Sequence, residues 1–111
     1  MIIEVLHFDR GRNKFEAVAE VTLDTVTSLD AALEYAYRWT NNISGSWSIK
    51  QEMLDDGTFN GDYNEAVKVL KKNFVGEDGR EYGRRSSMMF DRMVVDGETY
   101  EVATVGFKKV A

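Results

Sequence analysis

The segment Gly83-Arg84-Arg85-Ser86-Ser87 has the residue types in this sequence that best suit binding chemistry. Two guanidinium groups beside two hydroxyl groups can clamp a phosphate or a carboxylate, because arginine presents its N–H donors in a fixed fork. The segment lacks the lysine and the spacing of a nucleotide-binding loop. It fits an anion or acidic-partner site and, as the simpler alternative, an ordinary charged surface loop.

His7 is the single histidine of the chain, and cysteine is absent. A lone imidazole needs an orienting partner for catalysis, and the sequence signals none nearby, so we expect a structural histidine. Without cysteine, the chain has no disulfide, thiolate nucleophile or cysteine–zinc site. We therefore predict no catalytic constellation and no cofactor.

A calcium-loop template matches in part at Asp56, Thr58, Asn60 and Gly61, which occupy its positions 1, 3, 5 and 6. The twelfth position requires a bidentate glutamate but holds Val67. The match fails where the geometry is most demanding, so the sequence predicts no metal site.

The charge balance argues against a protein that binds nucleic acid through phosphate contacts. The formal net charge is −5 and the pI is about 4.9, whereas such proteins are usually basic. A nucleic-acid binder is nevertheless one alternative, with Trp47 as a stacking platform. It would need several basic residues to converge on one face: Arg10, Arg12, Arg84, Arg85, Lys108 and Lys109.

The chain of 111 residues suits a single domain, residues 1–111. No apolar run is long enough to span a membrane, and no signal-peptide pattern opens the chain. We therefore expect a cytoplasmic protein without a membrane partner. An exposed edge strand would be able to support a dimer.

Two hairpins are predicted at the ends of the chain. Residues 2–8 and the alternating residues 15–23 form the first, with a turn at 10–13. Residues 90–107 form the second around Asp96-Gly97, the dipeptide that best fits a two-residue type I′ turn. This turn places Arg92 opposite Glu101, and it puts a core face on four residues: Met93, Val95, Tyr100 and Val102.

Two helices are predicted between the hairpins. Thr27 and Asp30 form a capping box for a helix that ends near Asn41, and Asp62 opens a second helix from about Tyr63 to Asn73. The intervening connection is irregular, with one short edge strand near residues 47–49. The order ββααββ indicates an α+β fold, in which two helices pack on one face of an antiparallel sheet.

The loops around residues 41–47 and 84–91 are expected to meet at one end of the sheet. Asp91 would hold Arg85 in place, or Trp47 would cover the serines. This corner serves structure or binding, and its candidate binding residues are Asn41, Trp47, Arg84, Arg85, Ser86 and Asp91.

The order of several motifs resembles small accessory proteins encoded by bacteriophages and bacterial mobile elements. These motifs are the segments 37–42, 46–47, 85–86 with Asp91, 95–97, 100–102 and 106–107. The resemblance covers about half of the chain. The chain departs from the group at Phe90, where a glycine tends to precede the aspartate, and this argues against a tight turn there. The group has no assigned activity, so the resemblance implies only an accessory role in a bacterial cytoplasm during infection or transfer.

Three functions follow as expectations. The first is a small acidic protein, without chemistry of its own, that binds and modulates a host or phage macromolecule, most readily a protein. The second is an anion-binding protein or enzyme that uses Arg84, Arg85 and Ser86, with Asp91 and His7 nearby. The third is the nucleic-acid binder.

Overall fold

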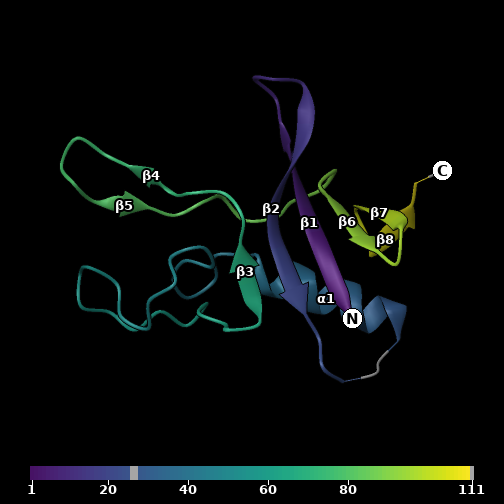
Figure 1. The fold of residues 1–111 in the computed structure, drawn as a ribbon, viewed down its shortest axis with the longest axis horizontal. Helices are drawn as coiled ribbons and strands as arrows, with labels where there is room; N and C mark the ends of the chain where they lie inside the picture. Colours follow the sequence, from purple (N-terminus) through teal and green to yellow (C-terminus); the bar gives the residue numbers. More distant parts are fainter. Residues whose placement is uncertain (26–27, 111) are drawn as a thin grey trace.

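The computed structural model describes residues 1–25 and 28–110. Within these residues it contains one helix, α1 (Leu29–Trp39), and eight strands (Figure 1). The strands are β1 (Ile2–Asp9), β2 (Lys14–Thr22), β3 (Val67–Val69), β4 (Phe74–Val75), β5 (Glu81–Tyr82), β6 (Arg92–Val95), β7 (Glu98–Val102) and β8 (Phe107–Lys109). The helix in this part of the chain is not long and apolar enough to cross a bilayer.

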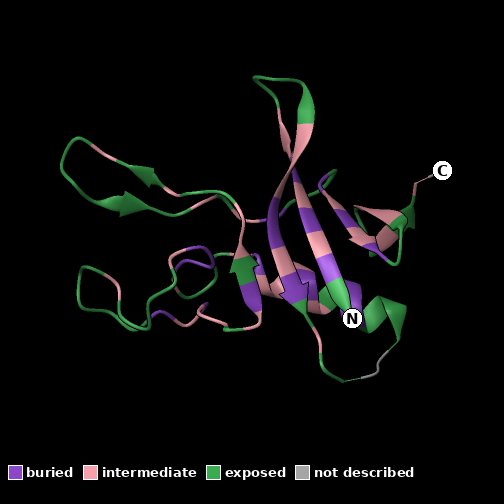
Figure 2. Cartoon of the chain, viewed as in Figure 1, coloured by how far each residue is buried: buried purple, intermediate pink, exposed green. Residues whose placement is uncertain are grey.

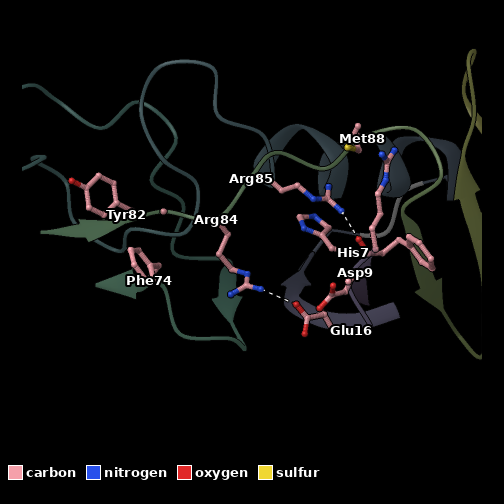
Figure 3. A pocket seen from close by; sticks show the side chains of 12 residues that line it. His7, Asp9, Glu16, Phe74, Tyr82, Arg84, Arg85 and Met88 are labelled. Carbon is pink, nitrogen blue, oxygen red and sulfur yellow. Dashed lines mark hydrogen bonds and ion pairs between the residues drawn. The ribbon is translucent and has the colours of Figure 1, made fainter. Parts of the chain in front are cut away.

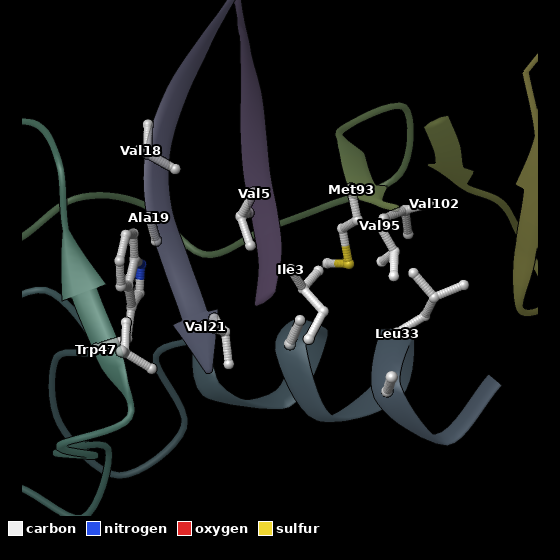
Figure 4. Packing of buried hydrophobic residues seen from close by; sticks show 13 residues of the cluster. Ile3, Val5, Val18, Ala19, Val21, Leu33, Trp47, Met93, Val95 and Val102 are labelled. Carbon is white, nitrogen blue, oxygen red and sulfur yellow. The ribbon is translucent and has the colours of Figure 1, made fainter. Parts of the chain in front are cut away.

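Six strands form one antiparallel sheet in the order β3-β2-β1-β6-β7-β8. Helix α1 covers one face of this sheet, and the sheet's buried side chains point toward it (Figure 4). The core combines these sheet residues with the apolar stripe of the helix and one tryptophan from the following loop: Ile3, Val5, Val18, Ala19, Val21, Ala32, Leu33, Ala36, Trp47, Val67, Met93, Val95 and Val102.

The strands β4 and β5 pair only with each other and extend away from the large sheet (Figure 1). We call residues 74–82 the arm. A second extension, residues 52–59, projects in the same direction, and we call it the acidic loop. Both carry mostly exposed side chains, as Figure 2 shows.

The closing hairpin is confirmed in position and register. Met93 pairs with Tyr100 and Arg92 with Glu101, as predicted. The turn residues Asp96 and Gly97 both have positive φ, 50° and 78°, which is the backbone that a type I′ turn requires. The predicted core side is buried at Met93, Val95 and Val102, and Tyr100 packs against it.

The first hairpin is also confirmed, but its predicted simple alternation is wrong. A β-bulge in the register between Val5 and Leu6 places two residues of β2 opposite one of β1. As a result, Val18 and Ala19 are both buried although they are neighbours. Ala17 consequently pairs with Leu6 and is only half-buried.

The second predicted helix does not exist, so the order ββααββ is wrong. Residues 67–69 instead form β3, which pairs with β2 and buries Val67. The supposed cap, Asp62, accepts hydrogen bonds from the backbone of Ile43 and Ser44 rather than from its own segment. Two valines at a spacing of two suit a strand, and here that local pattern prevails over the capping signal.

Helix α1 is confirmed, and its first residue is Leu29. Ser28 is its N-cap, with its hydroxyl accepting from the N–H of Ala31 at 3.2 Å. The predicted cap Thr27 lies outside the described residues. Arg38, in the last turn of the helix, forms an ion pair with Asp62 at 3.1 Å.

The connection after the helix contains no strand at residues 47–49, contrary to prediction. It is organised by Asn60, which is fully buried. The Asn60 amide nitrogen lies within 3.0 Å of the carbonyls of Ser46, Ile49 and Gln51, and its oxygen accepts from the N–H of Ser46 at 2.9 Å. Asn60 therefore faces inward and cannot serve as a calcium ligand in an open loop.

Candidate functional site

The two loops expected to form a corner do meet. Asn42 donates its backbone N–H to the hydroxyl of Ser86 at 2.8 Å, and its side-chain amide donates to the carbonyl of Arg84 at 3.0 Å. The indole N–H of Trp47 donates to the carbonyl of Arg85 at 2.8 Å. These three hydrogen bonds fix residues 84–86 against the end of the helix.

Asp91 holds Arg85 through two parallel hydrogen bonds, at 2.6 and 2.9 Å. Its carboxylate is almost fully buried and also accepts the backbone N–H groups of Phe8 and Met88. Burial alone raises the pKa of Asp91, but the hydrogen bonds from Arg85 and the two N–H groups, with the proximity of His7, outweigh it and lower the pKa. Asp91 is a structural anion at neutral pH.

A tight turn precedes Asp91. This contradicts the expectation that Phe90, in place of the glycine found in the resembled group, argues against a tight turn there. Asp91 donates its N–H to the carbonyl of Met88 at 3.0 Å, and Phe90 has φ of 77°. This is the left-handed region that favours glycine, and a bulky side chain there is strained. Phe90 is 61% exposed, so contacts of its side chain do not explain the conformation.

The guanidinium of Arg84 is also engaged within the protein. It pairs with Glu16 at 2.9 Å and donates to the carbonyl of Lys72 at 3.0 Å. The two terminal nitrogens of Arg85 make four hydrogen bonds, including those to the carbonyls of Phe8 and Ser86. Neither arginine presents an open fork to an anion. The Ser86 hydroxyl accepts from Asn42 and does not line a cleft beside them.

Buried hydroxyls connect His7 to the end of the helix. The Thr40 hydroxyl donates to the carbonyl of Ala36 at 2.8 Å, which uses its one proton. The contact of 2.7 Å between the Thr40 and Ser87 hydroxyls must then be donated by Ser87. In turn, the contact of 2.9 Å between Ser87 and His7 Nε2 must be donated by the imidazole. This proton count places the hydrogen of the neutral ring on Nε2 and leaves Nδ1 with a free lone pair.

The environment keeps His7 neutral. Its side chain is buried, and the ring of Trp47 packs against it edge-on, with the two ring centroids 6.0 Å apart. Burial lowers the pKa of His7 to about 4; Asp91 opposes the shift, whereas Arg85 and Arg84 add to it. At neutral pH His7 is thus a hydrogen-bond acceptor at Nδ1 and not a cation.

A cleft of about 680 Å³ opens in front of this corner. Its wall contains His7, Arg84 and Arg85, and its far end contains Phe74 and Tyr82 of the arm (Figure 3). The tip of the β1–β2 hairpin closes a third side with residues 8–11 and Glu16. The predicted candidates Arg84 and Arg85 therefore line a cleft, whereas Ser86 and Asp91 do not.

Two other candidates are structural. Trp47 is fully buried, so it offers no platform for stacking a base. The Asn41 side-chain amide donates to the carbonyl of Tyr37 at 2.5 Å and so closes the last turn of the helix. Among the described residues, no group of three or more histidine, aspartate or glutamate side chains is placed to hold a metal ion.

Sequence reasoning missed the exposed apolar residues of the two extensions. Phe74 and Phe59 are each 70% exposed, and Met53 is 54% exposed. A signal for both extensions was present, because Asp78-Gly79 and Asp56-Gly57 repeat the dipeptide that identified the closing hairpin. The glycines of both have positive φ, 79° and 87°. Met53 and Phe59 form a bridge across one turn, and β4 pairs with β5 across the other.

No family model, curated protein or solved structure matches this chain.

Proposed function

We propose that this protein is a non-enzymatic binding protein, whose arm and acidic loop together contact an apolar, positively charged surface of a protein partner. The observation that carries this proposal is the exposure of large apolar side chains on both extensions: Met53, Phe59, Phe74, Val75 and Tyr82. Isolated exposed apolar residues are ordinary, but a group on two neighbouring projections is typical of an interaction surface.

The two extensions are adjacent along one side of the molecule. A groove of about 220 Å³ lies between them and is lined by Leu54 from the acidic loop and Tyr82 from the arm. The chain therefore presents one broad surface, to which both extensions contribute aromatic side chains. Aromatic residues are the ones most often found to dominate binding energy.

Charge defines the partner. The acidic loop carries three carboxylates and no cation, and the arm carries three carboxylates and Arg80, so together they have a formal charge of −5. This equals the formal net charge of the whole chain, and the remaining residues balance. None of the six carboxylates forms an ion pair with a described residue. Such a field attracts a basic surface and repels nucleic acid.

The resemblance of the motif order to small phage and mobile-element proteins supplies the proposed context. In that context the partner is a host or phage protein, and the chain modulates it by occupying its surface. The buried state of Trp47 and the internal pairing of Arg84 and Arg85 favour this function over the nucleic-acid and anion-binding alternatives.

Co-purification with matched variants tests the proposal. The wild-type protein is expressed in a bacterial host and recovered beside a Phe59→Ser/Phe74→Ser double variant and an Ile43→Ser control. Ile43 is 65% exposed but lies outside both extensions. We expect a stoichiometric protein that is retained by wild type and by the control, lost by the double variant, and released by increased salt.

A different pattern would contradict the proposal. If the double variant retains the same proteins as wild type, in infected and uninfected cells alike, the two extensions are not an interaction surface. Circular dichroism of the double variant provides the folding control, because exposed Phe→Ser changes leave the core intact.

A further inference from the structure

The cleft in front of the corner has three distinct parts along its length. Figure 3 shows Phe74 and Tyr82 at one end and His7 with Arg85 at the other, with the Arg84–Glu16 pair between them. Its volume of about 680 Å³ is typical of a ligand site. Because the Arg84–Glu16 pair lies between the two ends, a ligand that contacts both of them must be extended.

The His7 end offers one unused hydrogen-bond acceptor. The hydrogen bonds of Ser87 and Thr40 require Nε2 to donate its hydrogen to the Ser87 hydroxyl. No hydrogen bond to Nδ1 is formed by any described residue, and His7 is part of the cleft wall. An oriented acceptor in a cleft wall that lacks a protein partner is well satisfied by an N–H or O–H group of a ligand.

The middle of the cleft does not select for charge. Arg84 is paired with Glu16 and Arg85 with Asp91, so neither of these arginines is an open cation. Arg10, at the tip of the hairpin, also lines the cleft and forms no ion pair with a described residue. At the tip of the hairpin, Asp9 lies 3.8 Å from the guanidinium of Arg12. At Arg84 and Arg85 an anionic ligand would have to displace a carboxylate, so an uncharged segment fits better between the two ends of the cleft.

The far end of the cleft is apolar and accessible. The rings of Phe74 and Tyr82 have centroids 6.2 Å apart and are inclined by 40° to each other. Tyr82 is fixed by the hydrogen bond from its hydroxyl to Asp78 at 2.8 Å, while Phe74 remains exposed. The pair forms a small apolar surface for a side chain that leaves water when it binds.

We propose that this cleft binds an extended, uncharged peptide segment of the protein partner, with an N–H or O–H group donated to His7 Nδ1 and an apolar side chain packed on Phe74 and Tyr82. The inference rests on the proposed function and adds the class of ligand and its contacts. It assigns the arm two roles, since its Phe74 side faces the cleft while its carboxylates belong to the acidic surface.

The probe is a displayed library of random linear 12-residue peptides, selected on the full-length wild-type protein. Synthetic copies of the selected peptides are then measured by fluorescence anisotropy against three variants. We expect binding about tenfold or more weaker with His7→Gln and with Phe74→Ser. Phe59→Ser is the matched control, because Phe59 is equally exposed but does not line the cleft. We expect it to bind as wild type.

Nitrogen-15 NMR of wild type gives a second readout that needs no variant. The single histidine makes its two ring resonances unambiguous. We expect a protonated Nε2 and an unprotonated Nδ1 in the free protein, and a shift of the Nδ1 resonance toward the hydrogen-bonded position when the peptide binds. This readout remains valid if His7→Gln fails to fold.

Three results would overturn the inference: a library that gives no binder, peptides that bind Phe74→Ser as tightly as wild type, or an Nδ1 resonance that does not respond to peptide. Each leaves the proposed function intact if co-purification still depends on Phe59 and Phe74. Conversely, peptide binding in the cleft without a partner that depends on Phe59 would separate the cleft from the acidic surface.

Discussion

Acidification from pH 7 to pH 5 should destabilise this protein through His7. The pKa of His7 falls from an ordinary value of 6.5 to about 4 in the folded state, chiefly because burial disfavours the cation. Between these two values the unfolded chain binds a proton that the folded protein does not. Stability from the neutral imidazole is thus fully present above pH 6.5 and is lost as the pH falls toward 4.

The magnitude follows from the two pKa values. At pH 5 almost all unfolded chains carry the histidine proton, whereas about a tenth of folded molecules do, so proton linkage lowers the free energy of unfolding by about 2 kcal/mol. The groups facing the ring, Asp91, Arg85 and Arg84, keep their charges throughout this window. The aspartates with a lowered pKa, Asp56, Asp78 and Asp91, titrate below 3.8 and do not contribute to the loss.

Urea unfolding at pH 7, 6 and 5 measures this loss, with His7→Gln as the control. Glutamine can donate to the Ser87 hydroxyl but does not titrate, so its variant should show a flat profile over the same range. Histidine NMR titration should place the folded-state pKa near 4. If wild type loses less than about 0.5 kcal/mol between pH 7 and 5, or if the variant loses as much as wild type, the buried neutral imidazole is refuted.

Four substitutions test other parts of the structure by chemical unfolding. Asp91→Asn removes the charge that holds Arg85, and it should cost about 2 kcal/mol, less than a fully buried pair because Arg85 is partly exposed; an unchanged midpoint would contradict the role of Asp91. Asn60→Ala leaves three carbonyls and two N–H groups without their partner and should cost about 3 kcal/mol; a loss below 1 kcal/mol would show that water replaces the amide. Phe90→Gly should raise the free energy of unfolding by about 0.5–1 kcal/mol, since relief of the positive φ exceeds the added chain entropy; a loss of stability would show that the exposed ring makes contacts of its own. Gly97→Ala should cost about 1 kcal/mol through its φ of 78° in open space, and no change would mean that the turn relaxes.

The parts of the fold that sequence predicts are those encoded by neighbouring residues. Asp96-Gly97 defines a turn, the turn defines a register, and the register defines which side of the hairpin is buried. The second helix failed because its capping residue has a better partner far away in the chain. Asp62 accepts hydrogen bonds from the backbone N–H groups of Ile43 and Ser44, which lie 19 and 18 positions earlier in the chain. No local sequence pattern reveals such a contact.

The candidate site divides in the same way. Proximity in sequence indicates that Asp91 can hold Arg85, and the structure shows that pair. The partners of His7 lie beyond such reach, since Ser87 is 80 positions away and is bound in turn to Thr40, 47 positions earlier. The hydroxyl chain that defines the tautomer therefore exists only in the folded protein. The arm escapes prediction for a simpler reason, since the predicted second helix reaches Asn73, directly before β4, and the turn signal Asp78-Gly79 lies beyond it.

The internal pairing of the arginines determines where binding can occur. If Arg84 and Arg85 were unpaired, the cleft would attract anions, and an acidic chain would repel the same ligands at longer range. Because Glu16 and Asp91 neutralise both, the cleft and the acidic surface do not oppose each other. In the proposed function, long-range attraction comes from the unpaired carboxylates of the acidic loop and the arm, and short-range selection comes from His7 Nδ1 and the two aromatic rings. A basic partner that offers an uncharged, extended segment satisfies both conditions at once, and an acidic or nucleic-acid ligand satisfies neither.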